Sequence, residues 1–232
     1  MKTAVFYHCL FFHGTPPRFR PIAMGIVCEQ MQQLKESGLM DSCDEMVVGI
    51  NGGDESLAIA KTVFPAKARL VMHGLDSKAE NLTIAEIEKW APSHPDWAVL
   101  YFHAKGCTHP PERIDKSDVS GQWRREMMQD VVTNWRQCVW DLRNHDIACP
   151  QWMWNMADGT QHISAGNFLW VRSSFVAKLP SIYSRARIQM SGIAAAESRY
   201  EAEVYWGNGP RPRVKDYRQS LAYLIFGAYP AV

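Results

Sequence analysis

Four short runs of apolar residues stand out in the first hundred positions, and stretches with a helical period separate them. The apolar runs predict strands at residues 2–12, 45–51, 68–73 and 97–103. In the stretches between them apolar residues recur every three or four positions, which predicts helices at residues 22–37, 56–63 and 81–91. Strands that alternate with helices favour an α/β fold with a mostly parallel sheet.

The second half of the chain follows a less regular pattern. A long amphipathic helix is predicted at residues 120–143, and short strands with functional loops at 151–171. Another helix is predicted at 194–204, before a break at 207–213 and a small apolar closing segment at 219–228. A chain of 232 residues fits a single domain, and its 47% hydrophobic and 21% charged residues are typical of globular proteins.

The charges of the chain are nearly balanced, with 25 Lys and Arg against 24 Asp and Glu. Binding to nucleic acid usually needs a basic excess, so this balance argues against it. Two local groups of basic residues leave a nucleic-acid-modifying transferase as a weaker alternative to a solvated face. They are Arg113 with Lys116, and Arg211 with Arg213 and Lys215.

The six cysteines are scattered, form no CxxC pair and lie partly in apolar segments. This pattern is typical of reduced, buried thiols and predicts a cytoplasmic protein. No run approaches the roughly 18 apolar residues of a membrane helix, so no membrane span is expected. His103, Cys107 and His109 are closely spaced metal-capable residues, but structural zinc sites use four ligands, and we interpret this segment as a loop.

Polar residues stand at the ends of three predicted strands, where open parallel sheets bind their ligands. The first strand carries Tyr7 and His8, and the second ends at Asn51 and Gly52. These residues are candidates for one side of a binding site.

The strand at 97–103 leads into His103, Ala104, Lys105 and Gly106. His103 and Lys105 are two residues apart, so both side chains can point to one side of the sheet, and Gly106 lets a ligand approach the backbone. Lysine is a common point charge for phosphate, which predicts an anion site. The alternative is a His103 bonded at the core edge and a solvated Lys105.

Two further groups of residues lie in the second half. Residues 162–170 place small residues beside His162, Asn167 and Trp170, which suits the hydroxyls and the apolar face of a sugar. A tight turn leading into a strand explains the same residues. In the predicted helix at 194–204, Glu197 with Glu201 and Arg199 with Glu203 are one turn apart, as surface helices also show.

Several of these segments together resemble a family of small glycosyltransferase-like proteins. Residues 101–106 resemble its YxHTKG segment, and Trp123-Arg124 resembles the WR pair that opens a long helix. Residues 162–170 resemble its HxSGNFWW segment, and Leu179-Pro180 with residues 199–206 resembles a later leucine–proline pair and an acidic, tryptophan-containing segment. Ala104, an extra Ala165 and Leu169 depart from the family pattern.

The resemblance implies a single GT-A-like domain over residues 1–232, with a nucleotide-binding half at about 1–110 and an acceptor half at about 111–232. It implies a nucleotide-sugar donor and a hydroxyl-bearing acceptor, a glycan or a small molecule. The donor-binding residues it implies are Tyr7, His8, Asn51, Gly52, Gly106, Trp123 and Arg124. The acceptor- or sugar-binding residues it implies are His162, Ser164, Gly166, Asn167, Trp170, Arg199 and Trp206.

The catalytic residues implied by the resemblance are Glu203, Glu201, Lys105 and His103. Most GT-A enzymes hold Mn²⁺ or Mg²⁺ with an Asp-x-Asp motif after the strand that corresponds to 97–103, where this chain has His103-Ala104-Lys105. We therefore expect Lys105, helped by His103, to replace the metal in stabilising the departing diphosphate. Bound Mn²⁺ or Mg²⁺ remains an alternative, because a few oxygen ligands from elsewhere suffice.

Glu203 is the expected general base, because it lies nearer to the expected stacking platform Trp206, and Glu201 is the alternative. A different class of function is also open. The chain could be a non-catalytic module that binds nucleotides or carbohydrates on a degenerate transferase fold.

Overall fold

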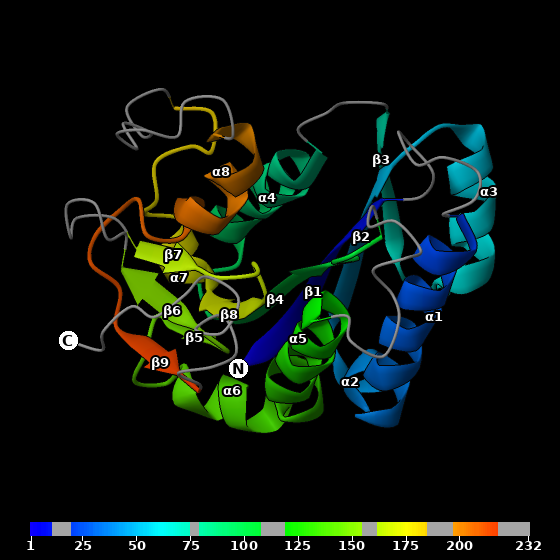
Figure 1. Ribbon diagram of the computed structural model, residues 1–232. Coiled ribbons are helices and arrows are strands. Elements are labelled where there is room, and N and C mark those ends of the chain that lie inside the picture. The colour runs from blue at the N-terminus through cyan, green and yellow to red at the C-terminus, as the bar shows by residue number, and fades with distance from the viewer. Residues whose placement is uncertain (11–19, 75–78, 108–118, 155–161, 185–196, 218–232) are drawn as a thin grey trace.

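A seven-stranded sheet with the strand order β3-β2-β1-β4-β8-β5-β9 forms the centre of the protein (Figure 1). The structure is a computed structural model, and it describes residues 1–10, 20–74, 79–107, 119–154, 162–184 and 197–217. The predicted α/β fold with a mostly parallel sheet flanked by helices is confirmed.

Four parallel strands make up one half of this sheet: β1 (Lys2–Leu10), β2 (Glu45–Asn51), β3 (Arg69–Gly74) and β4 (Trp97–His103). All four were expected from their apolar runs, and β2 and β4 have the predicted bounds. Since β1 is fully buried from Ala4 to Tyr7, both of its faces are covered by the chain. Parallel strands end at the same edge, so the polar residues at the ends of β1, β2 and β4 come together.

The other half of the sheet is mixed, with β8 (Leu169–Arg172), β5 (Ile147–Cys149) and β9 (Val214–Asp216). Strand β8 runs antiparallel to both β4 and β5, while β9 is parallel to β5. A separate antiparallel pair consists of β6 (Trp152–Trp154) and β7 (His162–Ser164). The short strands expected within 151–171 are therefore present, whereas β5 and β9 were not predicted because three residues are too few to show a period.

Helices cover both faces of the sheet (Figure 1). One face packs against α1 (Arg20–Glu36), α2 (Leu39–Ser42), α3 (Asp54–Val63), α5 (Val119–Met128) and α6 (Trp135–Asp141). The opposite face packs against α4 (Ala79–Trp90), the 3₁₀ turn Ala91–Ser93, α7 (Ser173–Val176) and α8 (Glu197–Tyr205). Two separate apolar cores result, one on each face.

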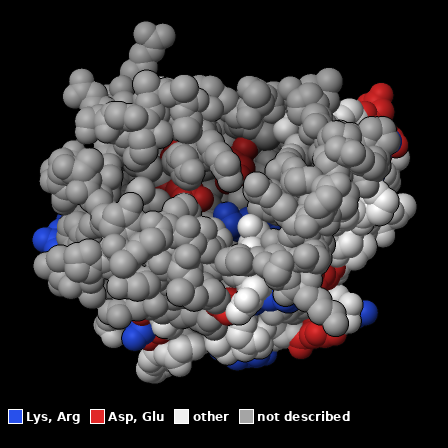
Figure 2. Space-filling model, in the orientation of Figure 1, with Lys and Arg blue, Asp and Glu red and all other residues white. Residues whose placement is uncertain are grey.

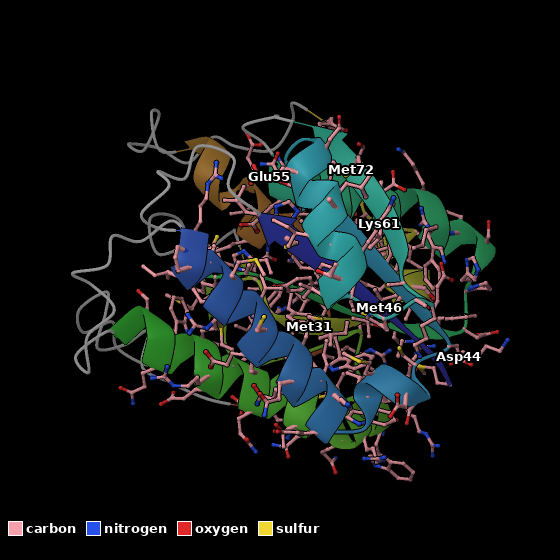
Figure 3. All side chains as sticks on the ribbon, turned by 90° about the vertical axis from the view of Figure 1, so that its right-hand side faces the viewer. Met31, Asp44, Met46, Glu55, Lys61 and Met72 are labelled. Carbon is pink, nitrogen blue, oxygen red and sulfur yellow. The ribbon has the colours of Figure 1, made fainter. Side chains whose placement is uncertain are left out.

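The amphipathic character of α1 and α3 is visible from the side (Figure 3). Met31 of α1 and Met46 of β2 are buried in the core between helix and sheet. Glu55 and Lys61 of α3 are exposed on the outer surface. This division follows the period of apolar positions that predicted both helices.

The long helix expected at 120–143 is interrupted. A π-helical turn, Gln129–Thr133, separates α5 from α6, and the Asn134 N–H bonds to the Gln129 carbonyl. The tryptophans on the predicted helices, Trp140 among them, are expected from the sequence to be mostly core residues. Trp140 is instead 57% exposed, with the Arg143 guanidinium 4.1 Å from its ring centre. The expectation was wrong because a π turn inserts residues into the helical repeat, so the helix beyond it presents a different face.

Of two further expectations for the second half of the chain, one is met and the other lies outside the described residues. The helix expected at 194–204 is α8, Glu197–Tyr205. The apolar segment at 219–228 and the residues His109, Arg113 and Lys116 lie outside the described residues. Within the described part of the chain, no helix combines the length and the apolar character that a membrane crossing requires.

Candidate active site at the carboxyl ends of the parallel strands

Charged side chains from separate parts of the chain meet at the carboxyl end of β4. Figure 2 shows acidic and basic side chains together in a hollow at the centre of the surface that faces the viewer. The hollow lies below α4 and α8 as these helices are placed in Figure 1. Glu203 lies close enough to Lys105, Glu80 and His103 for each to affect the pKa of its carboxyl group. Three of these four residues were expected at the site, and Glu80 was not.

Glu80, in the first turn of α4, forms an ion pair with His103. Its Oε1 lies 2.9 Å from His103 Nδ1, and its Oε2 accepts a 2.9 Å hydrogen bond from Asn167 Nδ2. Burial acts to raise the pKa of Glu80, but the charge and the hydrogen bond of His103 outweigh it, so the pKa lies well below the ordinary value. Glu80 is therefore a carboxylate at neutral pH.

The segment between β7 and β8 forms a β-turn against this pair. The Asn167 N–H bonds to the Ser164 carbonyl at 3.0 Å, and Gly166, with φ 79°, adopts the positive φ of the third residue of a type II turn. Asn167 is itself left-handed, with φ 58°. The Gly166 carbonyl oxygen lies 3.1 Å from His103 Nε2, so the turn is tied to the end of β4.

Glycine is required at position 166 for a second reason. A Cβ there would lie 2.5 Å from the Sδ of Met127 and 3.0 Å from Cζ2 of Trp123. Both side chains belong to α5, so the turn and α5 approach each other closely. The tight turn that the sequence suggested within 162–170 is present.

Glu203, on α8, is half-buried beside this turn. Its carboxylate accepts a hydrogen bond from the Gly166 backbone, whose carbonyl faces His103. Burial raises the pKa of Glu203, against the lowering effect of the nearby Lys105 charge. A half-buried carboxyl group with a raised pKa is suited to accept a proton near neutral pH.

The ammonium of Lys105 lies 4.4 Å from the centre of the Trp123 ring. The backbone at Lys105 is held by Arg124, whose Nη1 donates to the Lys105 carbonyl at 3.1 Å while its Nη2 pairs with Glu29 at 3.2 Å. Among the described residues no carboxylate lies within ion-pair distance of the Lys105 ammonium. Trp123 therefore packs against the Lys105 ammonium, and Arg124 holds the backbone of the same residue.

Glu201, the other candidate base, points to a different neighbour. Its Oε2 accepts a 2.7 Å hydrogen bond from Asn81 Nδ2 on α4. The side chains of Arg199 and His162 lie outside the described part of the structure, while their backbones belong to α8 and β7. The expected pairing of Arg199 with Glu203 and the expected role of His162 therefore stay predictions.

A second polar group lies at the ends of β1 and β3. Thr83 Oγ1, on α4, is 2.8 Å from His8 Nδ1 and 2.9 Å from His73 Nε2. Gly49 of β2 makes room for them, since a Cβ there would lie 2.0 Å from Thr83 Oγ1. Burial lowers the pKa of His8 to about 3, so its ring is neutral at pH 7.

Three expected binding residues are placed in the core instead. Tyr7 is fully buried, with its hydroxyl 2.7 Å from Gln30 Oε1. Trp170 and Trp206 are also fully buried and donate their indole N–H groups to the Val131 carbonyl and to Asn167 Oδ1. The expectation of a tryptophan platform for sugar stacking is corrected, because neither ring has an exposed face and both indoles serve internal hydrogen bonds.

The remaining expected residues border the same region. Asn51 and Gly52 are buried at the end of β2, where the Gly52 N–H bonds to the Gly74 carbonyl at 2.7 Å. Gly106 follows β4 with φ 94°, and Ser164 is fully buried at the start of the turn.

Five residues of this region were not predicted from the sequence: Glu80, Asn81, Thr83, His73 and Gln30. Gln30 of α1 donates to the His103 carbonyl at 3.0 Å and accepts from Tyr7, so it holds the end of β4 from the other face. The available signal for Glu80 was weak. It stands one residue before the predicted start of a helix, where an acidic residue is ordinarily explained by the helix dipole.

The described residues at the end of β4 do not fit a divalent cation. No group of three or more metal-capable side chains is present among the described residues. At the place of an Asp-x-Asp motif, His103 has both ring nitrogens engaged by protein atoms, and Lys105 adds a positive charge.

The fold and the site define an α/β protein with an acid–base cluster at the carboxyl ends of its parallel strands. The chain belongs to the family described as a domain of unknown function, DUF8361, whose model matches residues 6–210 and so spans the whole site. No curated protein matches the chain.

Solved structures resemble the chain in fold. One, from Desulfovibrio desulfuricans, is provisionally named a nucleotide-diphospho-sugar transferase and shows a TM-score of 0.48 at 13% identity, with 93% of this chain and 80% of that chain covered. Another, a 4-diphosphocytidyl-2C-methyl-D-erythritol synthase, shows a TM-score of 0.42 at 11% identity, with 97% and 96% covered. At these TM-scores neither similarity identifies a substrate or a reaction for this chain.

Proposed function

We propose that the protein is a glycosyltransferase that moves a sugar from a nucleotide-sugar donor to a hydroxyl group of an acceptor. The observation that carries the proposal is the pairing of an available cation with a half-buried carboxyl group at the end of β4. Lys105 supplies the cation and Glu203 the carboxyl group, and the two lie close enough to interact electrostatically.

In the proposed reaction Glu203 takes the proton from the acceptor hydroxyl. The acceptor oxygen then attacks the anomeric carbon, and the bond from this carbon to the nucleoside diphosphate breaks. Lys105 stabilises the negative charge that develops on the leaving diphosphate. His103 contributes its charge through space, because both of its ring nitrogens are bonded to Glu80 and Gly166.

The proposed donor side comprises the ends of β1, β2 and β4, with Gly52 and Gly106 as points of close backbone approach and Asn51 at the end of β2. The acceptor would enter from the side of α8 and the turn at Gly166. This division follows the resemblance to GT-A proteins.

The proposed setting of the protein is the cytoplasm. Its support is that all six cysteines are free and five of them are buried, as is typical of reduced thiols.

Donor turnover tests the proposal. The protein is incubated with UDP-, GDP-, CDP- and dTDP-sugars, with EDTA or with Mn²⁺, and released nucleoside diphosphate is measured. Release that requires Lys105 and Glu203 supports a transferase. Binding of a donor without release, even with acceptors supplied, would favour a binding module, and neither binding nor release would refute both.

A further inference from the structure

We propose that Glu80 is a positioning residue for Glu203, acting through the Gly166–Asn167 turn. Glu80 does not border the reacting atoms in the proposed reaction. Its carboxylate instead holds two successive residues of the turn. Gly166 is held through His103, and the Asn167 side chain is bonded directly. The proposal rests on the proposed function only in calling Glu203 the base.

The direction of each hydrogen bond in this network follows from chemistry. The Trp206 indole N–H can only donate, and it lies 2.7 Å from Asn167 Oδ1. Asn167 therefore presents its NH₂ group to Glu80, whose Oε2 must accept. The second arm is fixed in the same way, since the Gly166 carbonyl can only accept and His103 Nε2 must carry a proton.

The one proton left to place lies between Glu80 Oε1 and His103 Nδ1. The pKa of Glu80 lies below its ordinary value, so its carboxyl group carries no proton at neutral pH. A carboxylate oxygen and a ring nitrogen 2.9 Å apart need a proton between them, and it therefore belongs to the imidazole. His103 is then an imidazolium with both N–H groups donating, and it faces charged or titratable groups on three elements: Glu80 on α4, Glu203 on α8 and the neutral His8 on β1.

The consequence reaches Glu203 through one residue. Gly166 accepts a hydrogen bond from His103 with its carbonyl oxygen and donates its N–H to the Glu203 carboxylate. Asn167, the second residue with a positive φ in this turn, is not a glycine, and a non-glycine residue adopts this conformation uncommonly. We infer that, without the charge of the Glu80 carboxylate, His103 keeps only its Nε2 proton. Both ties of the turn then change from charge-assisted to neutral hydrogen bonds, which are weaker.

Nitrogen NMR of the full-length protein tests the proposal without any substrate. At pH 7, ¹⁵N signals of the wild-type His103 ring, assigned by their absence in His103→Gln, should show two protonated nitrogens. Glu80→Gln, of the same shape but without the charge, should leave one. The matched control is Glu86→Gln, the same change on the same helix, where the carboxylate pairs with Lys89 and Arg69 near the surface.

Two further measurements separate positioning from mere folding. Hydrogen exchange of the Gly166 amide should become at least about 10-fold faster in Glu80→Gln and stay unchanged in Glu86→Gln. With an active donor, Glu80→Gln should lower kcat with little change in the donor KM. A wild-type His103 with one bare nitrogen, or unchanged Gly166 exchange in a folded Glu80→Gln protein, would overturn the proposal. If no donor is turned over while the NMR result holds, the proposed function fails and the network remains.

Discussion

His103 Nε2 lies 3.1 Å from the carbonyl oxygen of Gly166, and this contact joins the end of β4 to the turn before β8. It brings together two residues 63 positions apart in the chain. Because Glu203 bonds the same glycine, the histidine at the strand end and the carboxyl group on α8 are separated by a single residue, Gly166. His103 and the proposed base therefore contact the same turn.

Lys105→Ala should weaken nucleoside diphosphate binding by about 10- to 100-fold, as loss of a hydrogen bond to a charged group costs roughly 1.5–3 kcal/mol. Isothermal titration with UDP, GDP, CDP and dTDP measures the change. Lys61→Ala, which removes an exposed lysine of α3, is the control and should bind like the wild type. Full affinity in Lys105→Ala would remove Lys105 from the donor site.

Glu203→Gln should lower turnover by about 10²- to 10⁴-fold, the usual contribution of a general base, while donor affinity is retained. In the wild type, activity should rise with pH through the raised pKa of Glu203, so the acid limb of the pH–rate profile should lie above the ordinary carboxyl range. Glu201→Gln is the comparison, since Glu201 bonds Asn81 instead. A larger loss in Glu201→Gln would transfer the role of base to Glu201.

Glu203→Gln should raise the stability of the folded protein at pH 7, although it lowers turnover. Because the folded-state pKa of Glu203 is raised, the unfolded chain releases this proton first, and stability falls as pH rises from the ordinary carboxyl range through the raised value. Glu203→Gln removes that loss, so at pH 7 it should unfold at a higher temperature than the wild type. Near pH 4 the two melting temperatures should converge, and a variant less stable at pH 7 would contradict the burial of the charge.

The sequence was sufficient to predict the parallel half of the sheet and the meeting of its polar strand ends at one edge. Continuous apolar runs report strands buried on both faces, and the carboxyl ends of such strands are where His103 and Lys105 stand. Glu203 was named from the family resemblance and preferred for its closeness to Trp206 in the sequence, although Trp206 is buried in the core. What Glu203 contacts could not be predicted, since the Gly166 turn reaches it from another part of the chain.

The two kinds of error in the site have opposite physical causes. Trp170 and Trp206 were expected at a sugar platform from their neighbours in the chain, but aromatic residues beside Asn and His pack equally well in a core with a bonded indole N–H. Glu80 was missed for the reverse reason. Its partners, His103 and Asn167, are 23 and 87 positions away, and no local pattern marks such a network.

Acid titration should show the buried state of His8. Its folded-state pKa of about 3 lies below the unfolded value of about 6.5, so the unfolded chain binds more protons between these values, and stability falls as pH decreases through this window. At roughly 1.4 kcal/mol for each pKa unit, the loss amounts to a few kcal/mol at most.

Urea unfolding at a series of pH values measures this loss, and His8→Gln should weaken the dependence between pH 6 and 4. The lowered pKa values of Glu80 and Asp146 act in the same direction but are common to both proteins, so the difference isolates His8. A His8 ring that takes up its proton near pH 6.5 in an NMR titration would contradict the prediction.

Gly49→Ala should destabilise the protein although Gly49 lies in a strand, where alanine is ordinarily tolerated better than glycine. The new Cβ would lie 2.0 Å from Thr83 Oγ1 and 2.4 Å from His73 Nε2, and the cost of such overpacking is about 1–3 kcal/mol. Gly25→Ala is the matched control, because no atom lies within 4 Å of its added Cβ on the exposed side of α1. It should stabilise by up to about 1 kcal/mol, as alanine in place of glycine does within a helix. Thermal unfolding of the two variants should therefore shift in opposite directions, and a stabilised Gly49→Ala would show that Thr83 and His73 do not require the space.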